Sequence, residues 1–172
     1  MSGNTSLVSA TPGFVAGTYS AQDVRLATMG QWPPGLMEAG DFVVSQRVAG
    51  ANMSVDIAAG RAIVDPQAGT HQGQYYVYRS SGTAYNTSAD GGYTWSASDP
   101  TLPRIDLLCI EIKDTVVDAS GTTGWRFRII DGTANASATH QLETAYWPAI
   151  PTGVLPIAAI LIPAAATTIT TA

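Results

Sequence analysis

Short apolar runs with a period of two residues, separated by turn residues, dominate the chain from residue 41 onward. Alternation of apolar and polar positions is typical of half-buried strands, because successive side chains of a strand point to opposite faces of a sheet. The pattern predicts strands at residues 42–48, 53–58, 61–64, 74–79, 93–95, 104–113, 125–130 and 154–162. Many short strands of this kind predict an all-β fold, a β-sandwich or barrel of short antiparallel strands.

Two of these runs are apolar on both faces. In residues 104–113 this pattern holds for most of the length, which predicts a central strand covered on both sides. Residues 154–162 share the pattern, but Pro156 and Pro163 restrict this strand to an edge, an end or a bulge, because proline cannot donate a ladder hydrogen bond.

Two other runs have one apolar and one polar face. Residues 53–58 alternate between apolar and polar side chains, which predicts one buried and one wetter face. In residues 125–130 aromatic and aliphatic positions alternate with arginines. This pattern predicts a half-exposed strand whose arginines reach solvent or a partner.

The N-terminal part of the chain lacks this alternation. Residues 1–19 are small, polar and rich in turn formers, which predicts an extended arm. Ser20 and Asp23 fit a helix-capping pattern, so one short helix is expected to follow the arm. We therefore expect an N-terminal arm with a short helix over residues 1–38 and a β domain over residues 39–172.

The composition and charge of the chain argue against nucleic acid and membrane as binding partners. Charged residues are 12% of the 172, and 13 acidic against 8 basic side chains give a formal charge of −5. The basic residues are scattered singly, so binding of nucleic acid is not expected. The longest apolar stretch, residues 154–166, is too short and too rich in proline for a span, so no membrane insertion is expected. No secretory signal is expected, and the single cysteine excludes an intramolecular disulfide.

No residue pattern points to catalysis. His71 and His140 lie in polar segments without a surrounding motif, so both are expected to be exposed loop histidines and not general bases. Cys109 lies in an apolar run, where a thiol behaves as a small buried hydrophobe. A polysaccharide hydrolase with Asp90 and Asp99 as its carboxylate pair is a weak hypothesis, because nothing positions either acid. We expect no enzyme activity and no catalytic residues.

Metal and cofactor binding have equally little support. The sequence contains no zinc-protease motif, no cysteine pair and no calcium-binding loop. Asp114, Asp118 and Asp131 can share a cation only if their loops meet, and solvated turn carboxylates are the favoured interpretation. We therefore expect no metal ion and no cofactor.

Aromatic residues are concentrated in one segment of the chain, which gives the candidate contact surface. Its members are Tyr75, Tyr76, Tyr78, Tyr85, Tyr93 and Trp95. Rigid rings with a polar tip are favoured at protein interfaces and in stacking on sugars. The alternative is that alternate tyrosines of a strand fill a core.

Three stretches together carry a further signal. They are Gly-Asp-Phe-Val-Val at 40–44 with Asn-Met-Ser-Val-Asp-Ile-Ala-Ala-Gly-Arg-Ala at 52–62, Asp-Pro-Thr-Leu-Pro-Arg-Ile-Asp-Leu-Leu at 99–108, and Pro-Ala-Ile-Pro at 148–151 with Leu-Pro-Ile-Ala at 155–158, Ile-Pro-Ala at 162–164 and Thr-Thr-Ile-Thr at 167–170. In this order and spacing, across residues 23–170, the chain resembles the minor tail and tail-fibre-associated proteins of tailed bacteriophages, especially those of actinobacterial hosts.

The resemblance implies a structural virion protein of the phage tail, at the tail tip, baseplate or fibre, made in the host cytoplasm. Such a protein assembles with other tail proteins and with copies of itself, and a trimer is the favoured homo-oligomer. The resemblance carries over no catalytic residues. An alternative of a different class is a module that binds host-surface glycan through the aromatic segment.

Three further expectations complete this interpretation, two from the resemblance and one from the side chains of the N-terminal segment. Arg104 and Asp106 are expected to act structurally, since residues two apart on a strand share a face. Longer members of the family continue past the Thr-Ile-Thr stretch, whereas this sequence ends at Ala172, so an adaptor or decorating role is expected before direct receptor binding. The candidate assembly arm is expected to dock on a neighbouring subunit. Its contact residues are Leu7, Val8, Phe14, Val15 and Tyr19.

Overall fold

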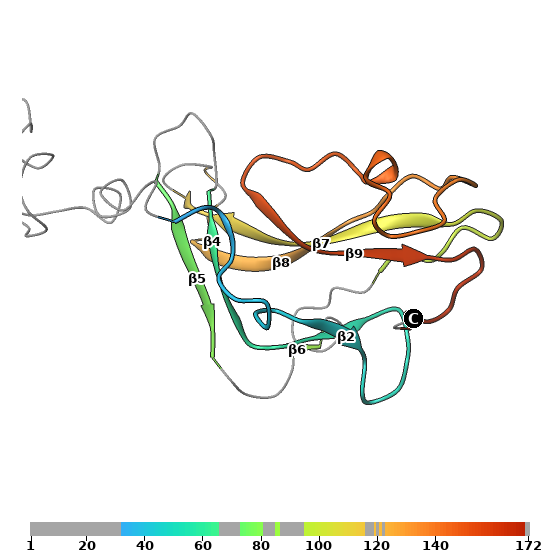
Figure 1. The fold of residues 1–172 in the computed structure, drawn as a ribbon, viewed down its shortest axis with the longest axis horizontal. Helices are drawn as coiled ribbons and strands as arrows, with labels where there is room; N and C mark the ends of the chain where they lie inside the picture. Colours follow the sequence, from blue (N-terminus) through green and yellow to red (C-terminus); the bar gives the residue numbers. More distant parts are fainter. Residues whose placement is uncertain are drawn as a thin grey trace, which may run out of the picture.

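The computed structural model describes residues 32–65, 73–80, 85–86, 95–115, 119, 121 and 123–170. These residues form three antiparallel sheets and one short 3-10 helix (Figure 1). The strands are β1 (Gly35–Leu36), β2 (Val44–Gln46), β3 (Val55–Ile57), β4 (Gly60–Val64), β5 (Tyr75–Arg79), β6 (Tyr85–Asn86), β7 (Arg104–Lys113), β8 (Gly124–Ile130) and β9 (Val154–Ile162), and the helix is η1 (Thr144–Tyr146). The prediction of an all-β fold of short antiparallel strands is confirmed.

The longest sheet has the order β8–β7–β9, so β7 is its central strand. Every residue of β7 except Lys113 is buried, which confirms the prediction of a strand covered on both faces. β9 runs antiparallel to β7 with a register shift between Leu108 and Cys109, where Pro156 pairs with Cys109. Among the described residues β9 has no strand on its other side, so both predicted features, an edge and a proline irregularity, are found.

The other two sheets have the orders β1–β4–β5 and β2–β3–β6, and the chain turns a corner between β3 and β4. Gly60 lies at this corner, where a Cβ atom would be 2.3 Å from the backbone nitrogen of Phe42. Phe42 has a positive φ of 52°, and its amide donates to the carbonyl oxygen of Ala59 at 3.1 Å. Only glycine fits this close approach, which lets the Phe42 side chain enter the core.

One hydrophobic core connects the three sheets, and in Figure 1 the β8–β7–β9 sheet lies across the layer that holds β2, β4, β5 and β6. The Phe42 ring packs edge-on against Phe127, with ring centroids 5.8 Å apart, and edge-on against Trp125 at 6.0 Å. Edge-to-face pairs of this kind contribute about 0.5–1.5 kcal/mol beyond the burial of their area. The buried members of the core are Phe42, Val55, Ile57, Ala62, Val64, Val77, Trp95, Leu108, Ile110, Ile112, Phe127, Ile162 and Ile169.

The second face of the β7 sheet lies beneath the segment 131–153, which contains η1 and crosses over the strands (Figure 1). The segment starts at Gly132, where a Cβ atom would lie 2.0 Å from the carbonyl oxygen of Ile105. It is fastened again where the Asn135 amide donates to the carbonyl oxygen of Pro103 at 2.8 Å. Close backbone contact therefore holds this segment against the start of β7, and Cys109, farther along the strand, is fully buried.

The strand predictions for residues 61–64, 74–79, 104–113, 125–130 and 154–162 are confirmed to within one residue at each end. They include the two runs that are apolar on both faces, β7 and β9, and the alternating run of β8, and each of the five strands pairs with at least one neighbour. The half-exposed character expected of the arginine-bearing strand is also found in β8.

Three expectations are corrected. The first predicted strand shortens to β2, because the positive φ of Phe42 breaks the extended backbone before it. The wetter face expected for residues 53–58 is wrong: Asp56 is buried because its carboxylate accepts the Val48 amide at 2.8 Å, which closes the loop between β2 and β3. Trp95 is not part of a strand, and its amide donates instead to the carbonyl oxygen of Met53 at 3.0 Å.

Candidate functional site

The aromatic segment divides into an inward and an outward set. Tyr75 is partly buried, and its hydroxyl donates to the Asp114 carboxylate at 2.5 Å, which ties β5 to the end of β7. Trp95 is only 3% exposed and belongs to the core. Tyr76 and Tyr78 are 57% and 55% exposed. Core filling therefore explains half of the described set, and the other half forms a surface.

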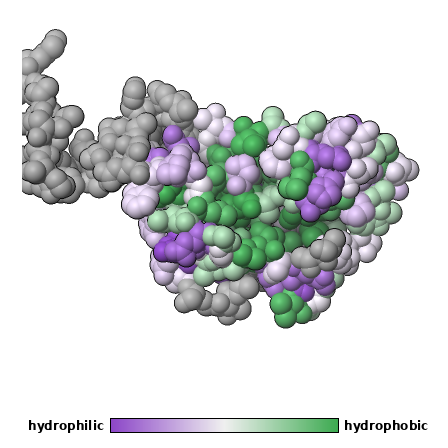
Figure 2. All heavy atoms as spheres, in the orientation of Figure 1, coloured by the Kyte–Doolittle hydropathy of each residue, from purple (hydrophilic) through white to green (hydrophobic). Residues whose placement is uncertain are grey.

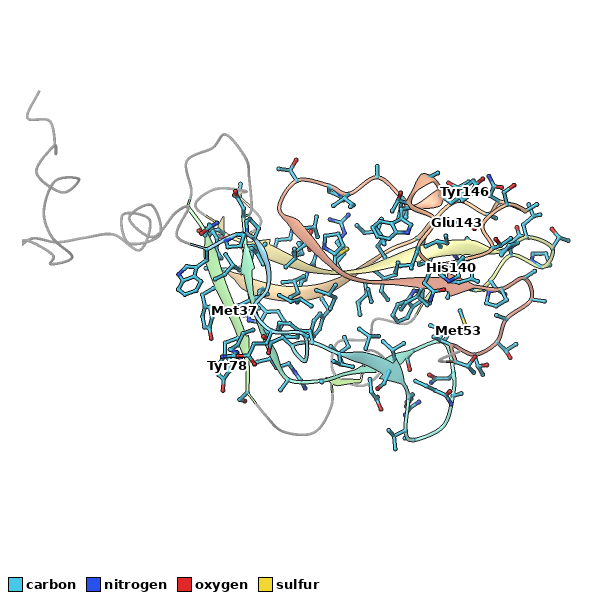
Figure 3. The ribbon with its side chains drawn as sticks, in the orientation of Figure 1. Met37, Met53, Tyr78, His140, Glu143 and Tyr146 are labelled. Carbon is cyan, nitrogen blue, oxygen red and sulfur yellow. The ribbon has the colours of Figure 1, made fainter. Side chains whose placement is uncertain are left out.

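The two exposed tyrosines form an ordered pair on β5. Their rings are parallel to within 9°, with centroids 6.5 Å apart. Residues two apart on a strand share a face, so the alternation Tyr75, Tyr76, Val77, Tyr78 sends the second and fourth side chains outward together. Figure 3 shows Tyr78 on β5, at the opposite end of the molecule from Tyr146.

An ion pair lies beside the tyrosine pair. Arg61 of β4 is directly opposite Tyr78, and Ile63 is opposite Tyr76. The Arg61 Nη2 donates to Glu38 Oε1 at 2.6 Å, and its Nε lies 3.7 Å from Asp41 Oδ1. The hydrogen bond to Glu38 raises the pKa of the Arg61 guanidinium further, so the group stays charged.

The outer face of the β1–β4–β5 sheet therefore combines aromatic rings with a cation that is paired with carboxylates. The Met37 amide donates to the Arg61 carbonyl oxygen at 3.2 Å, which places Met37 in the same row as Arg61 and Tyr78, and Met37 is exposed. We call Met37, Arg61, Tyr76 and Tyr78 the tyrosine platform. The sequence pattern indicates only the two tyrosines of the platform, because Met37 and Arg61 come beside them through the register of three paired strands.

A second surface lies along β9. All nine residues of this strand are apolar, and every one except Ile162 is partly exposed. Four of them, Leu155, Ile157, Ala158 and Ile160, also pack against the core. Figure 2 shows apolar side chains gathered in the middle of the face on which β9 lies. The strand thus presents a continuous apolar edge to its surroundings.

A charged cluster lies on the other side of β7. The buried carboxylate of Glu111 accepts from Arg126 Nε at 2.5 Å and from Arg128 Nη1 at 2.7 Å, and Lys113 lies 3.6 Å away. Burial alone would raise the pKa of Glu111, but the hydrogen bonds from the two arginines outweigh it and lower the pKa below its ordinary value. The guanidinium groups of the arginines predicted to reach solvent or a partner are therefore held by a carboxylate that no sequence pattern singles out.

Arg104 and Asp106 form a buried structural pair. Arg104 Nε donates to Asp106 Oδ1 at 2.9 Å, and its two terminal nitrogens donate to the carbonyl oxygens of Ser96 and Ala97, each at 2.8 Å. Asp106 also accepts the Gly132 amide at 2.7 Å. Burial raises the pKa of Asp106, and these hydrogen bonds offset part of that effect. The pair holds two loops against β7, and its donors and acceptors are used within the chain.

The residues considered for catalysis have structural roles where the structure describes them. Burial raises the pKa of the Cys109 thiol to about 12, so it is not a nucleophile at neutral pH. Asp99 accepts the amides of Thr101 and Leu102, and these bonds lower its pKa, the opposite of what a general acid needs. His140 is exposed, and its Nδ1 accepts the Leu142 amide at 3.2 Å.

The candidate cation site does not form from its described members. Asp131 follows β8, beside the start of β7, and accepts from Ser96 Oγ at 2.6 Å, whereas Asp114 follows the other end of β7. The two carboxylates therefore lie at opposite ends of the sheet. Within the described part of the chain no group of three His, Cys, Asp or Glu side chains is arranged to hold a metal ion.

Several sequence candidates lie outside the described residues. They are Leu7, Val8, Phe14, Val15, Tyr19, His71, Asp90, Tyr93 and Asp118, together with the short helix expected after Ser20. Of Tyr85 the structure describes the backbone, which pairs with Ile57 in the β3–β6 ladder. These expectations remain predictions.

The described residues include no helix long and apolar enough to cross a membrane. Comparison of the chain with models of known protein families, with curated proteins and with solved structures finds no match.

Proposed function

We propose that this chain is a structural protein of a bacteriophage tail, which acts by assembling with copies of itself and with other tail proteins. Two lines of support meet in this proposal. The first is the resemblance of the three sequence stretches to minor tail proteins. The second, and the single structural observation that carries it, is the apolar edge strand β9.

An unprotected edge strand favours association. Monomeric proteins usually protect the edges of their sheets with charged side chains, very short strands or covering loops. β9 is nine residues long and contains no charged residue. Pro156 is the one residue of this strand that opposes pairing with another strand. Subunit interfaces of permanent oligomers are apolar and resemble a protein core cut in half. The β9 surface has this composition.

A second copy of the same chain is the occupant that fits β9 best. With no charge on the strand, its recognition depends on apolar packing, and an apolar surface is complementary to itself. Pro156 interrupts any continuous ladder of hydrogen bonds along the edge, so the contact is made by side chains. Three copies can bring their β9 strands together around one axis, which is the trimer that the resemblance to tail proteins favours.

The oligomeric state in solution tests this proposal. Light scattering of the purified chain is expected to give the mass of a trimer. Leu161 lies on the face of β9 opposite the residues that pack on the core, so Leu161→Glu should leave the fold intact and shift the mass to a monomer. The matched control is Leu142→Glu, because Leu142 is 71% exposed and lies in the segment 131–153.

A monomeric wild-type chain at micromolar concentration would contradict self-assembly. An equal loss of association in the Leu142 and Leu161 variants would remove β9 as the contact. Circular dichroism of each variant shows whether the fold has been kept.

Attachment to the particle is a separate part of the proposal. The arm residues Leu7, Val8, Phe14, Val15 and Tyr19 are proposed to dock on a neighbouring subunit, so deletion of residues 1–19 should block incorporation into particles. Immunogold labelling of phage tails made with the full and the truncated chain measures this. Labelling of tails by the truncated chain at the wild-type level would contradict the role of the arm.

A further inference from the structure

The tyrosine platform is a surface that self-assembly through β9 does not use. Tyr76 and Tyr78 lie on β5, in the β1–β4–β5 sheet, and β9 belongs to a different sheet. Large exposed aromatic side chains are costly to leave in water, and these two rings lie in nearly parallel planes with centroids 6.5 Å apart. Such a pair of rings favours a ligand with flat apolar faces, which can stack on them.

The polar groups beside the rings narrow the chemistry of that ligand. Arg61 offers guanidinium donors, Glu38 offers carboxylate acceptors, and the tyrosine hydroxyls both donate and accept. A pyranose ring matches this combination, because it has an apolar face of C–H groups and an edge of hydroxyls. Sites for small molecules characteristically combine aromatic surface with a few placed polar groups.

The charge of the platform indicates which of the ligands that stack on tyrosine rings fits best. Arg61 is paired with Glu38 at 2.6 Å and lies 3.7 Å from Asp41, so the cation is fully offset by carboxylates. Nucleotides and acidic glycans also stack on tyrosine, but their anionic groups need unneutralised cations. A neutral ligand fits the local charge.

We infer that the platform of Met37, Arg61, Tyr76 and Tyr78 binds a neutral pyranose saccharide, with the sugar rings stacked on the two tyrosines and their hydroxyls hydrogen-bonded to Arg61 and Glu38. This binding does not depend on the assembly proposed for β9. In a tail protein it would add contact with saccharide at the cell surface to a structural role.

The binding experiment uses the full chain and defined oligosaccharides. The probes are cellohexaose, maltohexaose and chitohexaose, with a hexamer of galacturonate as the anionic comparison. Tyrosine ring resonances of the ¹³C-labelled chain are followed during titration. Because the platform is open, binding in the millimolar range is expected for at least one neutral hexamer, with weaker binding of the anionic one.

Variants locate the site and separate stacking from charge. Tyr78→Ala should weaken binding about tenfold, whereas Tyr78→Phe, which keeps the ring, should weaken it about twofold. Tyr146→Ala is the matched control and should leave binding unchanged, because Tyr146 lies at the opposite end of the molecule (Figure 3). Glu38→Gln exposes the charge of Arg61 and should improve binding of the galacturonate hexamer.

Three results would overturn the inference. The first is that none of the neutral hexamers moves the Tyr76 and Tyr78 resonances at millimolar concentration. The second is that Tyr78→Ala and Tyr146→Ala weaken binding equally. The third is that the resonances respond to protein concentration and not to saccharide, which would assign the platform to a protein contact. Since Leu161→Glu removes β9 association without touching the platform, failure here is distinguishable from failure of the assembly proposal.

Discussion

The strands β8 and β9 both pair with β7, but the exposed surface of β8 is charged and that of β9 is apolar. β8 carries Arg126 and Arg128, which hydrogen-bond to Glu111 and leave charged groups at the surface. β9 carries no charged or polar side chain along its nine residues. One side of the sheet therefore has the charges that discourage pairing with another chain, and the other side lacks them.

This difference indicates where association is allowed. Charge on an edge acts against self-association because a second copy would bring like charges together and desolvate them. The arginines of β8 are half-exposed and fixed at one end by Glu111, so they cannot turn away. The proposed self-assembly therefore predicts that β9, and not β8, is the side of the sheet that meets a second copy.

The largest loss of stability is expected from a substitution in β7, the strand with which β8 and β9 both pair. Asp106→Ala removes the partner of the buried Arg104 guanidinium and an acceptor of the Gly132 amide. The loss should be about 3–5 kcal/mol in the free energy of unfolding, because a buried charge is left uncompensated. Urea denaturation measures this loss. Asp99→Ala, at an exposed turn, should cost no more than about 1 kcal/mol, and equal losses in the two variants would refute the role of the buried pair.

The Glu111 cluster should make the stability of the β8 side depend on pH. The folded pKa of Glu111 is lowered, so its contribution is complete above the unfolded value near 4.5 and is lost as the pH falls through the folded value. Glu111→Gln should cost about 1–3 kcal/mol at neutral pH, and the difference from wild type should shrink toward about pH 3. Urea midpoints across this range test the sign. A difference that grows on acidification would contradict it.

A smaller effect is expected when the charges of β8 are removed. Replacing Glu111, Arg126 and Arg128 together by leucine gives this side of the sheet an apolar surface like that of β9 and leaves no unpaired carboxylate buried there. The variant should form larger assemblies than wild type, with a mass that rises with concentration, because it offers a second apolar surface. Replacement of the two arginines alone by lysine is the control, and this variant should keep the wild-type mass. An unchanged mass in the leucine variant would show that the charges do not prevent contact.

The sequence predicts the fold better than it predicts the surfaces. The apolar side chains on both faces of residues 104–113 and the two prolines around 154–162 indicate the central and edge strands, because both are local patterns of the sequence. The positive φ of Phe42 and the loop closure by Asp56 depend on contacts with distant backbone, so no local pattern reveals them. For this reason the first strand and the polar face of the second are predicted wrongly.

The same distinction holds for the candidate site. Once β5 is known to be a strand, Tyr76 and Tyr78 can be placed on one face, because residues two apart on a strand share a face. Met37 and Arg61 join them through pairing across β1 and β4, and this register is set by tertiary structure. Glu111 is recognisable as an anchor only when β8 is paired with β7, which brings Arg126 opposite it.

The most direct test of the β9 contact is chemical cross-linking at one engineered cysteine. The native Cys109 is buried with a pKa of about 12 and gives no background, so Ala159→Cys places one reactive thiol per chain on β9. A short bifunctional maleimide is predicted to yield covalent dimers from this variant and none from the Leu142→Cys control. Equal cross-linking of the two variants, or none at Ala159 in a chain that light scattering shows to be oligomeric, would contradict the account.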